Sequence, residues 1–395
     1  SYLTSNDKIT STNFYRHKTF AYQKFGKVKL GFVDDFENNK FVLDSTRRFT
    51  PRTYQFWEWE GSISSADSSM NFMKLFYKER RDKQAYNNEV KDSTMATNIG
   101  FQANINSIKN NPFSVYVTYR QLNLKNTISS ILKPDNTFLN RLEYNPRWFK
   151  GLLSMGIFYE TGYGLENKRE YYYIEVAPGQ GQFSWLDYNN DNIKQLNEFE
   201  IAQFSDQAKY IRIYAPTNQY VKVLQNQLSA SINIRPQSLL REKKSKSAKF
   251  ASRFALQTAY RIDNKTMDNG ELYYFNPFLN IDDTLMIANT NNFRQSFFFN
   301  QSSSVIGGDY TYINNASKQL LNNGIETRLL ETHEVKWRLN FAKWFTINST
   351  GLMGIKGNHS LLFSSRNYLL HILEAEQKLS YQPGTTFRIS VLYKY

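Results

Sequence analysis

The apolar residues of this chain recur at every second position, over segments longer than an ordinary strand. Within residues 95–106 the odd positions are mostly apolar and the even positions are small or polar, and residues 335–341 and 387–395 repeat the pattern. Period two is typical of an extended strand whose two faces meet different environments. We count roughly fifteen such segments of about nine to twelve residues, and a tilted strand needs about nine to eleven to cross a bilayer core.

Strands of soluble β-sandwiches are shorter, at about five or six residues. The polar positions here include Arg, Lys and Glu, and they alternate with aromatic residues, which make up 16% of the chain. Tyr54, Phe56, Trp57 and Trp59, and also residues 171–173, are typical of the aromatic girdles at membrane interfaces. The pattern therefore predicts an all-β fold, a transmembrane antiparallel up-and-down β-barrel of about 14–18 strands. A large soluble all-β protein is the alternative.

The composition excludes several other classes of protein. No stretch reaches about 18 consecutive apolar residues, so no transmembrane helix is expected. The mean hydropathy of −0.59 does not separate a soluble protein from a barrel, because polar loops and a polar lumen lower the average. The chain has no cysteine, which excludes disulfides, thiolate zinc sites and cysteine nucleophiles. It starts at Ser1 without a leader, and we expect a processed or trimmed piece of a longer polypeptide.

Short and long connections alternate along the sequence. The short ones are near residues 66–69, 109–112, 145–150, 303–308, 342–344 and 382–384, and the long ones near 36–52, 80–93, 124–138, 162–217 and 261–292. Outer-membrane barrels alternate tight periplasmic turns with longer extracellular loops in this way. We therefore predict one barrel domain over residues 1–395 with an extracellular insert at about 162–217. Because bacterial barrels have even strand numbers, the odd count means either that one strand is miscounted or that flanking sequence completes the wall, and the missing leader favours the second explanation.

Acidic and amide residues gather in this insert, although the net charge of the chain is +14. Asp187, Asn189, Asp191 and Glu198 stand at the first, third, fifth and twelfth positions of a twelve-residue window. This is the ligand spacing of an EF-hand-type calcium loop, in which hard oxygen ligands converge on one cation. The sequence predicts a structural calcium site that fastens an external loop.

Two positions depart from that calcium-loop pattern. Asn192 replaces the usual glycine, although asparagine tolerates the left-handed backbone better than most residues. Lys194 replaces an apolar residue, and no flanking helices are expected. A solvated turn rich in Asp and Asn is the alternative, while Glu200 and Asp206 are further oxygen ligands nearby.

Two segments carry a resemblance to a protein family. Residues 179–221 and the ending LSYQPGTTFRISVLYKY resemble large, poorly characterised outer-membrane β-barrel proteins of Bacteroidota, and the likeness extends from about residue 140 onward. The resemblance implies a surface-exposed barrel that forms the C-terminal portion of a longer polypeptide, with no established activity. The family has Gly where Asn192 stands.

Catalytic motifs are not found in the sequence. The four histidines, His17, His333, His359 and His371, lie in no G-x-S-x-G or H-E-x-x-H context, and a triad needs three groups together. His17 is expected before the first strand, and the others in strands or near turns. The basic run 241–249 is either a solvated turn or a site for phosphate, lipid headgroups or a partner. Nucleic acid is not expected, because no recognition module accompanies the run.

These observations lead to two hypotheses about function. The first is a non-enzymatic barrel of the bacterial outer membrane that is a subunit or scaffold of an envelope complex for export, insertion or display of surface proteins. Its partners are then outer-membrane lipids and other envelope proteins. The alternative is a diffusive or substrate-gated transport channel.

Overall fold

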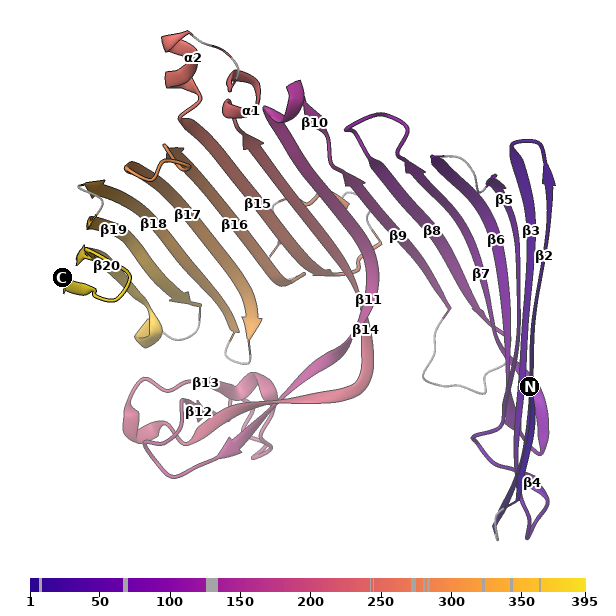
Figure 1. Ribbon diagram of the computed structural model, residues 1–395. Coiled ribbons are helices and arrows are strands. Elements are labelled where there is room, and N and C mark those ends of the chain that lie inside the picture. The colour runs from indigo at the N-terminus through magenta and orange to yellow at the C-terminus, as the bar shows by residue number, and fades with distance from the viewer. Residues whose placement is uncertain are drawn as a thin grey trace. The chain divides into compact units, whose positions relative to one another are not determined.

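The computed structural model of the chain describes all residues except 7–8, 67–69, 126–133, 242, 244, 271–274, 280, 283–284, 322–323, 342–343 and 362–363. The side chains at 169, 214–216, 218 and 364 are not described either. Strands make up most of the chain, and the few helices are short (Figure 1). Among the described residues, no helix is long and apolar enough to cross a membrane.

Fifteen strands of the described chain have ten residues or more. They are β2 (Thr10–Phe25), β3 (Val28–Leu43), β5 (Tyr54–Ser65), β6 (Asn71–Tyr86), β7 (Glu89–Ile105), β8 (Phe113–Leu124), β9 (Asp135–Tyr144), β11 (Leu153–Glu175), β14 (Tyr210–Ile234), β15 (Phe254–Met267), β16 (Met286–Phe299), β17 (Ile306–Leu321), β18 (Gly324–Phe341), β19 (Phe345–Ser360) and β20 (Tyr368–Tyr381). Their number agrees with the predicted count.

Shorter elements complete the described chain. The short strands are β1 (Tyr2–Asn6), β4 (Arg48–Phe49), β10 (Arg147–Trp148), β12 (Phe183–Trp185), β13 (Phe199–Ile201) and β21 (Ile389–Lys394). The helices are α1 (Gln237–Leu240) and α2 (Lys246–Ala251), with single 3₁₀ turns η1 (Phe149–Gly151), η2 (Leu196–Glu198), η3 (Ser205–Gln207) and η5 (Ser364–Arg366). Part of the basic run, 246–249, therefore lies in α2.

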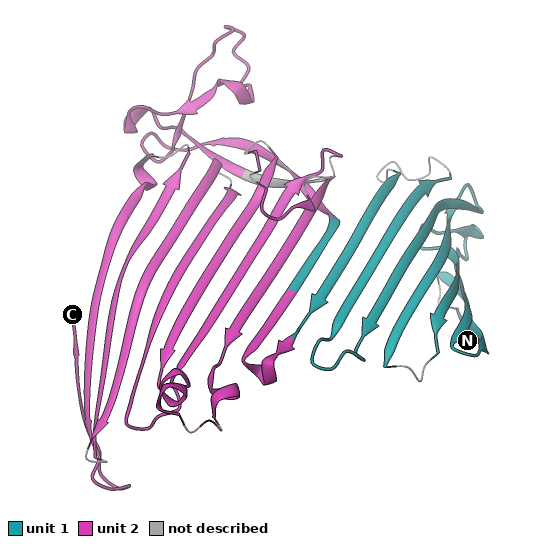
Figure 2. Cartoon of the chain, turned by 90° about the horizontal axis from the view of Figure 1, so that it is seen from above, with its two compact units in different colours: residues 1–146, 158–163 teal, residues 147–157, 164–395 magenta. Residues whose placement is uncertain are grey.

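The strands are joined as an antiparallel meander. The chain divides into two compact units, residues 1–146 with 158–163, and residues 147–157 with 164–395 (Figure 2). In the first unit each long strand from β2 to β9 pairs with its neighbour in the chain. In the second unit β11 pairs with β14, and β14 to β21 pair in succession. This confirms the predicted all-β, antiparallel up-and-down barrel fold.

One face of the first unit is apolar and exposed. The register aligns Leu30, Ile63, Leu75 and Phe101 in one row across β3, β5, β6 and β7. All four side chains are exposed, and Ile63 and Leu75 retain more than half of their accessible surface. In water this row would cost about 25 cal/mol for each Å² of apolar area left unburied. Its exposure indicates that hydrocarbon covers it.

The opposite face of the same strands carries ion pairs. Arg16 of β2 contacts Asp35 of β3 at 3.0 Å, and Lys78 of β6 pairs with Glu58 of β5. The register places Asp35 opposite Glu58, and Glu58 opposite Arg80. Alternating residues of one strand thus separate an apolar environment from a polar one, as the two sides of a membrane barrel wall do.

The second unit repeats this division between faces. Phe297, Val335, Met353 and Leu373 lie on one exposed face of β16, β18, β19 and β20, and Leu373 retains 67% of its accessible surface. Charged pairs lie on the other face. They are Arg261–Asp263, Lys336–Glu334 and Lys394–Glu376.

The predicted long connection at residues 80–93 is wrong. β6 continues to Tyr86 and β7 begins at Glu89, so a two-residue hairpin joins them. Asn87 and Asn88 have φ values of 48° and 63°, the left-handed backbone that such a tight turn requires. The strand ends are polar on both faces, so the period-two signal fades while the backbone pairing continues. For the same reason His17 lies inside β2 and not before the first strand.

Strands also extend into the insert expected at residues 162–217. β11 contains residues 162–175 and β14 contains residues 210–217, which leaves residues 176–209 as the connection between them. Within the second unit, this connection and the helices α1 and α2 lie at opposite ends of the strands (Figure 1). Residues 176–209 are called the insert below.

Candidate metal site

The insert is built on a small strand pair. β12 and β13 are antiparallel, with Trp185 opposite Phe199, and Phe183 of β12 also pairs with Tyr210 at the start of β14. The hairpin between them carries residues 186–198, which include all four predicted calcium ligands. A strand pair anchored to β14 therefore positions the candidate site.

Aromatic residues give the insert a packed core of its own. Phe183 retains 3% of its accessible surface, and Tyr210 is also buried. Tyr173, Trp185 and Phe199 pack around these two side chains. The rings of Tyr173 and Phe199 stack with their centroids 4.0 Å apart. Burial of aromatic surface holds this hairpin against the ends of β11 and β14.

Carboxylates fold the hairpin loop around their own backbone. Asp187 Oδ1 accepts a hydrogen bond from Asp191 N at 3.2 Å, and Asp187 Oδ2 accepts one from Asn192 N at 2.8 Å. Asp191 Oδ1 accepts one from Ile193 N at 2.7 Å. Asn189 donates from Nδ2 to Asp191 Oδ2 at 2.8 Å. These hydrogen bonds close residues 187–193 into a compact turn.

The two departures from the calcium-loop pattern do not disturb this geometry. Asn192 has a φ of 58°, so asparagine adopts the left-handed backbone for which glycine is usual. Lys194 donates from Nζ to Glu175 Oε2 at 2.9 Å, and hydrogen bonding to Tyr210 and then to Glu175 raises the pKa of its ammonium group. The lysine is therefore engaged with strand residues at the base of the insert.

Glu198 is the most deeply buried acid in this region. It retains 1% of its accessible surface, and its Oε2 accepts hydrogen bonds from Trp185 Nε1 at 2.9 Å and from Gln195 N at 3.1 Å. Gln195 and Glu198 form a capping box for η2. These contacts compensate the cost of burying the carboxylate and fix its position.

Three of the four predicted ligands come together. One oxygen atom each from Asp187, Asp191 and Glu198 lies within 4.8 Å of the other two. Asn189 lies at the edge of this group. Its Nδ2 donates to Asp191 Oδ2, and its Oδ1 accepts a hydrogen bond from Asp191 N. An all-oxygen donor set of this charge fits Ca²⁺ better than softer transition metals. Within the described residues the cluster does not include Glu200, which accepts a hydrogen bond from Tyr188.

A second polar cluster was not predicted from the sequence. His333 lies on the apolar face of the second unit together with Glu331, Tyr310 and Tyr312. The available signal was the spacing Glu-x-His, which places both side chains on one face of a strand. The pairing with Tyr310 and Tyr312 depends on strand register, which one sequence does not reveal.

Together, the two faces of the long strands define the class of protein. Antiparallel strands long enough to cross a bilayer, apolar on one exposed face and ion-paired on the other, are those of a β-barrel protein of the bacterial outer membrane.

Comparisons with known proteins add little to this class. No family model and no curated protein matches the chain. Solved structures similar to it include the ferric-catecholate import receptor Fiu from E. coli K12 in its open form, at 8% identity and TM-score 0.31, over 96% of this chain and 75% of the receptor. Another is a double mutant of the Serratia marcescens hemophore receptor HasR in complex with its hemophore HasA and heme. This receptor has 11% identity and a TM-score of 0.25, and the match covers 97% of this chain and 72% of the receptor.

Proposed function

We propose that this chain forms the wall of an outer-membrane transport channel, diffusive or substrate-gated. The observation that carries the proposal is the ion-paired face of the strands. In a barrel this face lines the lumen, and a lumen lined with fixed charges favours water and dissolved solutes over a packed apolar core. The Bacteroidota origin implied by the sequence resemblance belongs to the same proposal.

The charges on this face have both signs. In the first unit Lys74 pairs with Glu60, and Lys78 pairs with Glu58, while Arg120 lies on the same face through its register with Asn98. Fixed charges of this kind set the ion selectivity of a pore.

Planar-bilayer conductance tests the transport proposal. The purified chain is expected to give steady current steps. Replacement K78Q removes one of the two cations that pair with Glu58 and leaves only Arg80, at 3.8 Å. The reversal potential in a KCl gradient is therefore expected to move toward cation selectivity. Y77F, on the opposite face of the same strand, is the matched control and should leave selectivity unchanged. A well-folded chain without current, or a Y77F shift equal to that of K78Q, would argue against a channel.

A role as subunit or scaffold of an envelope complex is the second candidate. It is supported by apolar side chains exposed on the insert, which are Leu186, Tyr188, Ile193, Leu196 and Phe204. Exposed apolar groups on a water-facing segment are typical of contacts with another protein. Crosslinking in native membranes is expected to join the insert to another envelope protein. A monodisperse monomer without crosslinked partners would contradict this role.

We also propose that calcium fastens the insert through Asp187, Asn189, Asp191 and Glu198. The proposal is supported by the ligand spacing, by the converging oxygen atoms and by the backbone of Asn192. Limited proteolysis of the vesicle-embedded chain is expected to cleave the insert faster in a chelator than in calcium. D191N should abolish this difference, whereas D206N, in η3 outside the cluster, should keep it. Equal cleavage rates of the wild-type chain with and without calcium would contradict the site.

A further inference from the structure

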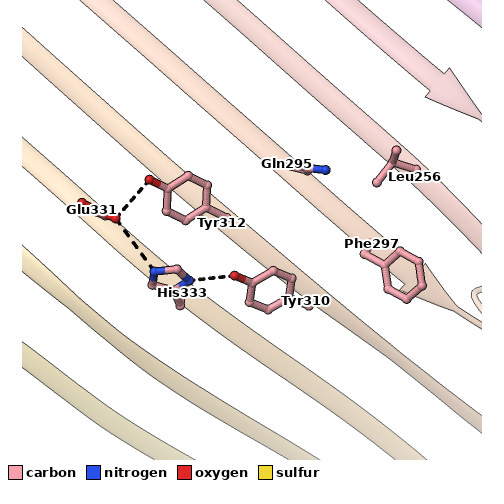
Figure 3. Close-up of a pocket in the computed structure, with 7 residues that line it drawn as sticks. All are labelled: Leu256, Gln295, Phe297, Tyr310, Tyr312, Glu331 and His333. Carbon is pink, nitrogen blue, oxygen red and sulfur yellow. Dashed lines mark hydrogen bonds and ion pairs between the residues drawn. The ribbon is translucent and has the colours of Figure 1, made fainter.

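The apolar face of the second unit contains one concentrated polar cluster. The register aligns Gln295, Tyr312 and His333 in one row, next to the row of Phe297, Tyr310 and Val335. Figure 3 shows Glu331, His333 and the two tyrosines drawn together on β17 and β18. They border a depression of about 390 Å³, lined by Leu256, Gln295, Phe297, Tyr310, Tyr312, Glu331 and His333.

Hydrogen bonds hold this cluster in place. Tyr310 Oη is 2.7 Å from His333 Nδ1, and Tyr312 Oη donates to Glu331 Oε1 at 3.0 Å. His333 Nε2 lies 3.9 Å from the same carboxylate oxygen. The rings of Tyr312 and His333 are tilted by 38° to each other, with centroids 4.9 Å apart. The side chains of Glu331 and His333 are both about one-third exposed, so the group is ordered and still accessible.

Glu331 differs from its neighbours in its ion pairs. Glu334 on the opposite face pairs with Lys336 at 2.8 Å, and Glu326 pairs with Arg366 at 3.1 Å. Across the described residues, no lysine or arginine forms an ion pair with Glu331. A carboxylate on a lipid-facing surface is costly unless a cation or the interface compensates it. Within the part of the chain that the structure describes, only the imidazole of His333, at 3.9 Å, faces this carboxylate as a cation-forming group, so Glu331 still has room for a cation from outside the chain.

The depth of the cluster is measured from Phe341 and Phe345, which stack where β18 ends and β19 begins and are typical of an aromatic girdle at one membrane interface. His333 is eight residues from Phe341, the last residue of β18. At about 3.3 Å per residue and about 40° of tilt, this distance along the membrane normal is about 20 Å, most of the ~25 Å apolar band of an outer-membrane barrel. Lipid headgroups begin at this depth.

We propose that this cluster binds the primary ammonium group of a lipid headgroup of the ethanolamine type. Glu331 supplies the negative charge, and the tyrosine hydroxyls and Gln295 supply further acceptors for the three N–H donors. Phe297 and Leu256 provide apolar surface for the lipid chain beside the polar cluster. The charge of Glu331 disfavours anionic headgroups that have no amine. This inference depends on the lipid contact of the apolar face and is independent of transport.

Lipid retention measured by native mass spectrometry tests the proposal. The full chain, stripped of lipid in mild detergent, is offered phosphatidylethanolamine, phosphatidylglycerol or phosphatidylcholine at equal concentration. The wild-type chain is expected to retain phosphatidylethanolamine about tenfold better than the other two, and E331Q should lose this preference. E334Q, three residues away on the opposite face, is the matched control and should keep it. Y312F, which preserves the ring, should reduce the preference about threefold and decides the matter if E331Q does not fold.

Several outcomes would overturn the assignment. Equal retention of the three lipids by the wild-type chain is one, and an unchanged preference in both E331Q and Y312F is another. Binding of free ethanolamine as tight as that of the lipid would assign the site to a soluble cation. Conductance recorded on the same samples keeps this result separate from the transport proposal.

Discussion

The long strands and the insert are stabilised in different ways. On the strands, large apolar residues such as Ile63 and Met353 retain more than half of their accessible surface. In the insert, Phe183 and Tyr210 are buried against three more aromatic rings. The insert therefore resembles a small water-soluble hairpin with its own core, whereas the strands leave their apolar face for a bilayer. The change from burial by protein to burial by lipid occurs at the start of β14.

This difference implies that the two regions respond to different changes. A cavity in the aromatic core should loosen the insert and leave the wall intact, because few contacts of the wall depend on that core. A charge on the apolar face should destabilise the wall and leave the insert intact.

F183A is expected to have the largest effect. Removal of a buried aromatic ring costs about 3–5 kcal/mol, and the loss should be confined to the insert. Hydrogen exchange in lipid vesicles should show loss of protection in residues 176–209 with unchanged protection in β6 and β7. F204A, at a side chain that is 61% exposed, is the control and should change little. Simultaneous loss of protection in the wall would contradict the separation of the two regions.

L75R tests the apolar face of the wall. An arginine near the middle of the bilayer costs about 2–4 kcal/mol, which urea unfolding in vesicles can measure. The register places Gln102, on the polar face, opposite Lys74. Q102R should therefore cost much less than L75R. Equal costs of the two substitutions would show that both faces meet the same environment.

E198A tests the buried acid of the insert. The substitution leaves Trp185 Nε1 and Gln195 N without their acceptor, and a buried donor without a partner costs about 1–3 kcal/mol. The measurement is protection of the insert by hydrogen exchange in a chelator, so that no metal contributes. E200A, at an exposed position, should have a smaller effect. A larger loss in E200A would show that the buried carboxylate is not the residue that holds the hairpin.

K194M is expected to have the smallest effect. Its ion pair with Glu175 is exposed, and exposed pairs contribute little. Hydrogen bonding to Tyr210, and then to Glu175, raises the pKa of Lys194. A raised pKa stabilises the fold below the ordinary lysine pKa, and this contribution disappears as pH rises through the folded value. Proteolysis of the insert should therefore distinguish K194M from the wild-type chain at neutral pH more than at strongly alkaline pH.

The sequence predicts most of the wall and only part of the insert. Period two reveals the membrane-facing strands because lipid requires an apolar residue at every second position. It does not reveal where strands end, as the hairpin at Asn87 and Asn88 shows, because both faces of a strand in water can be polar. The spacing of Asp187, Asp191 and Glu198 in the sequence indicated that these three acids lie together at one candidate site. The core around Phe183 and the contacts of Glu331 depend on pairings between distant residues, which spacing does not encode.

Site-directed spin labelling along β6 tests the central claim most directly. Because the chain has no cysteine, single cysteines at consecutive positions of residues 72–79 can be labelled without background. In vesicles, labels at Met73, Leu75 and Tyr77 should be accessible to oxygen and protected from a water-soluble nickel reagent, and labels at Lys74 and Lys78 should show the reverse. Uniform accessibility of both sets to the nickel reagent would contradict a wall whose apolar face meets lipid.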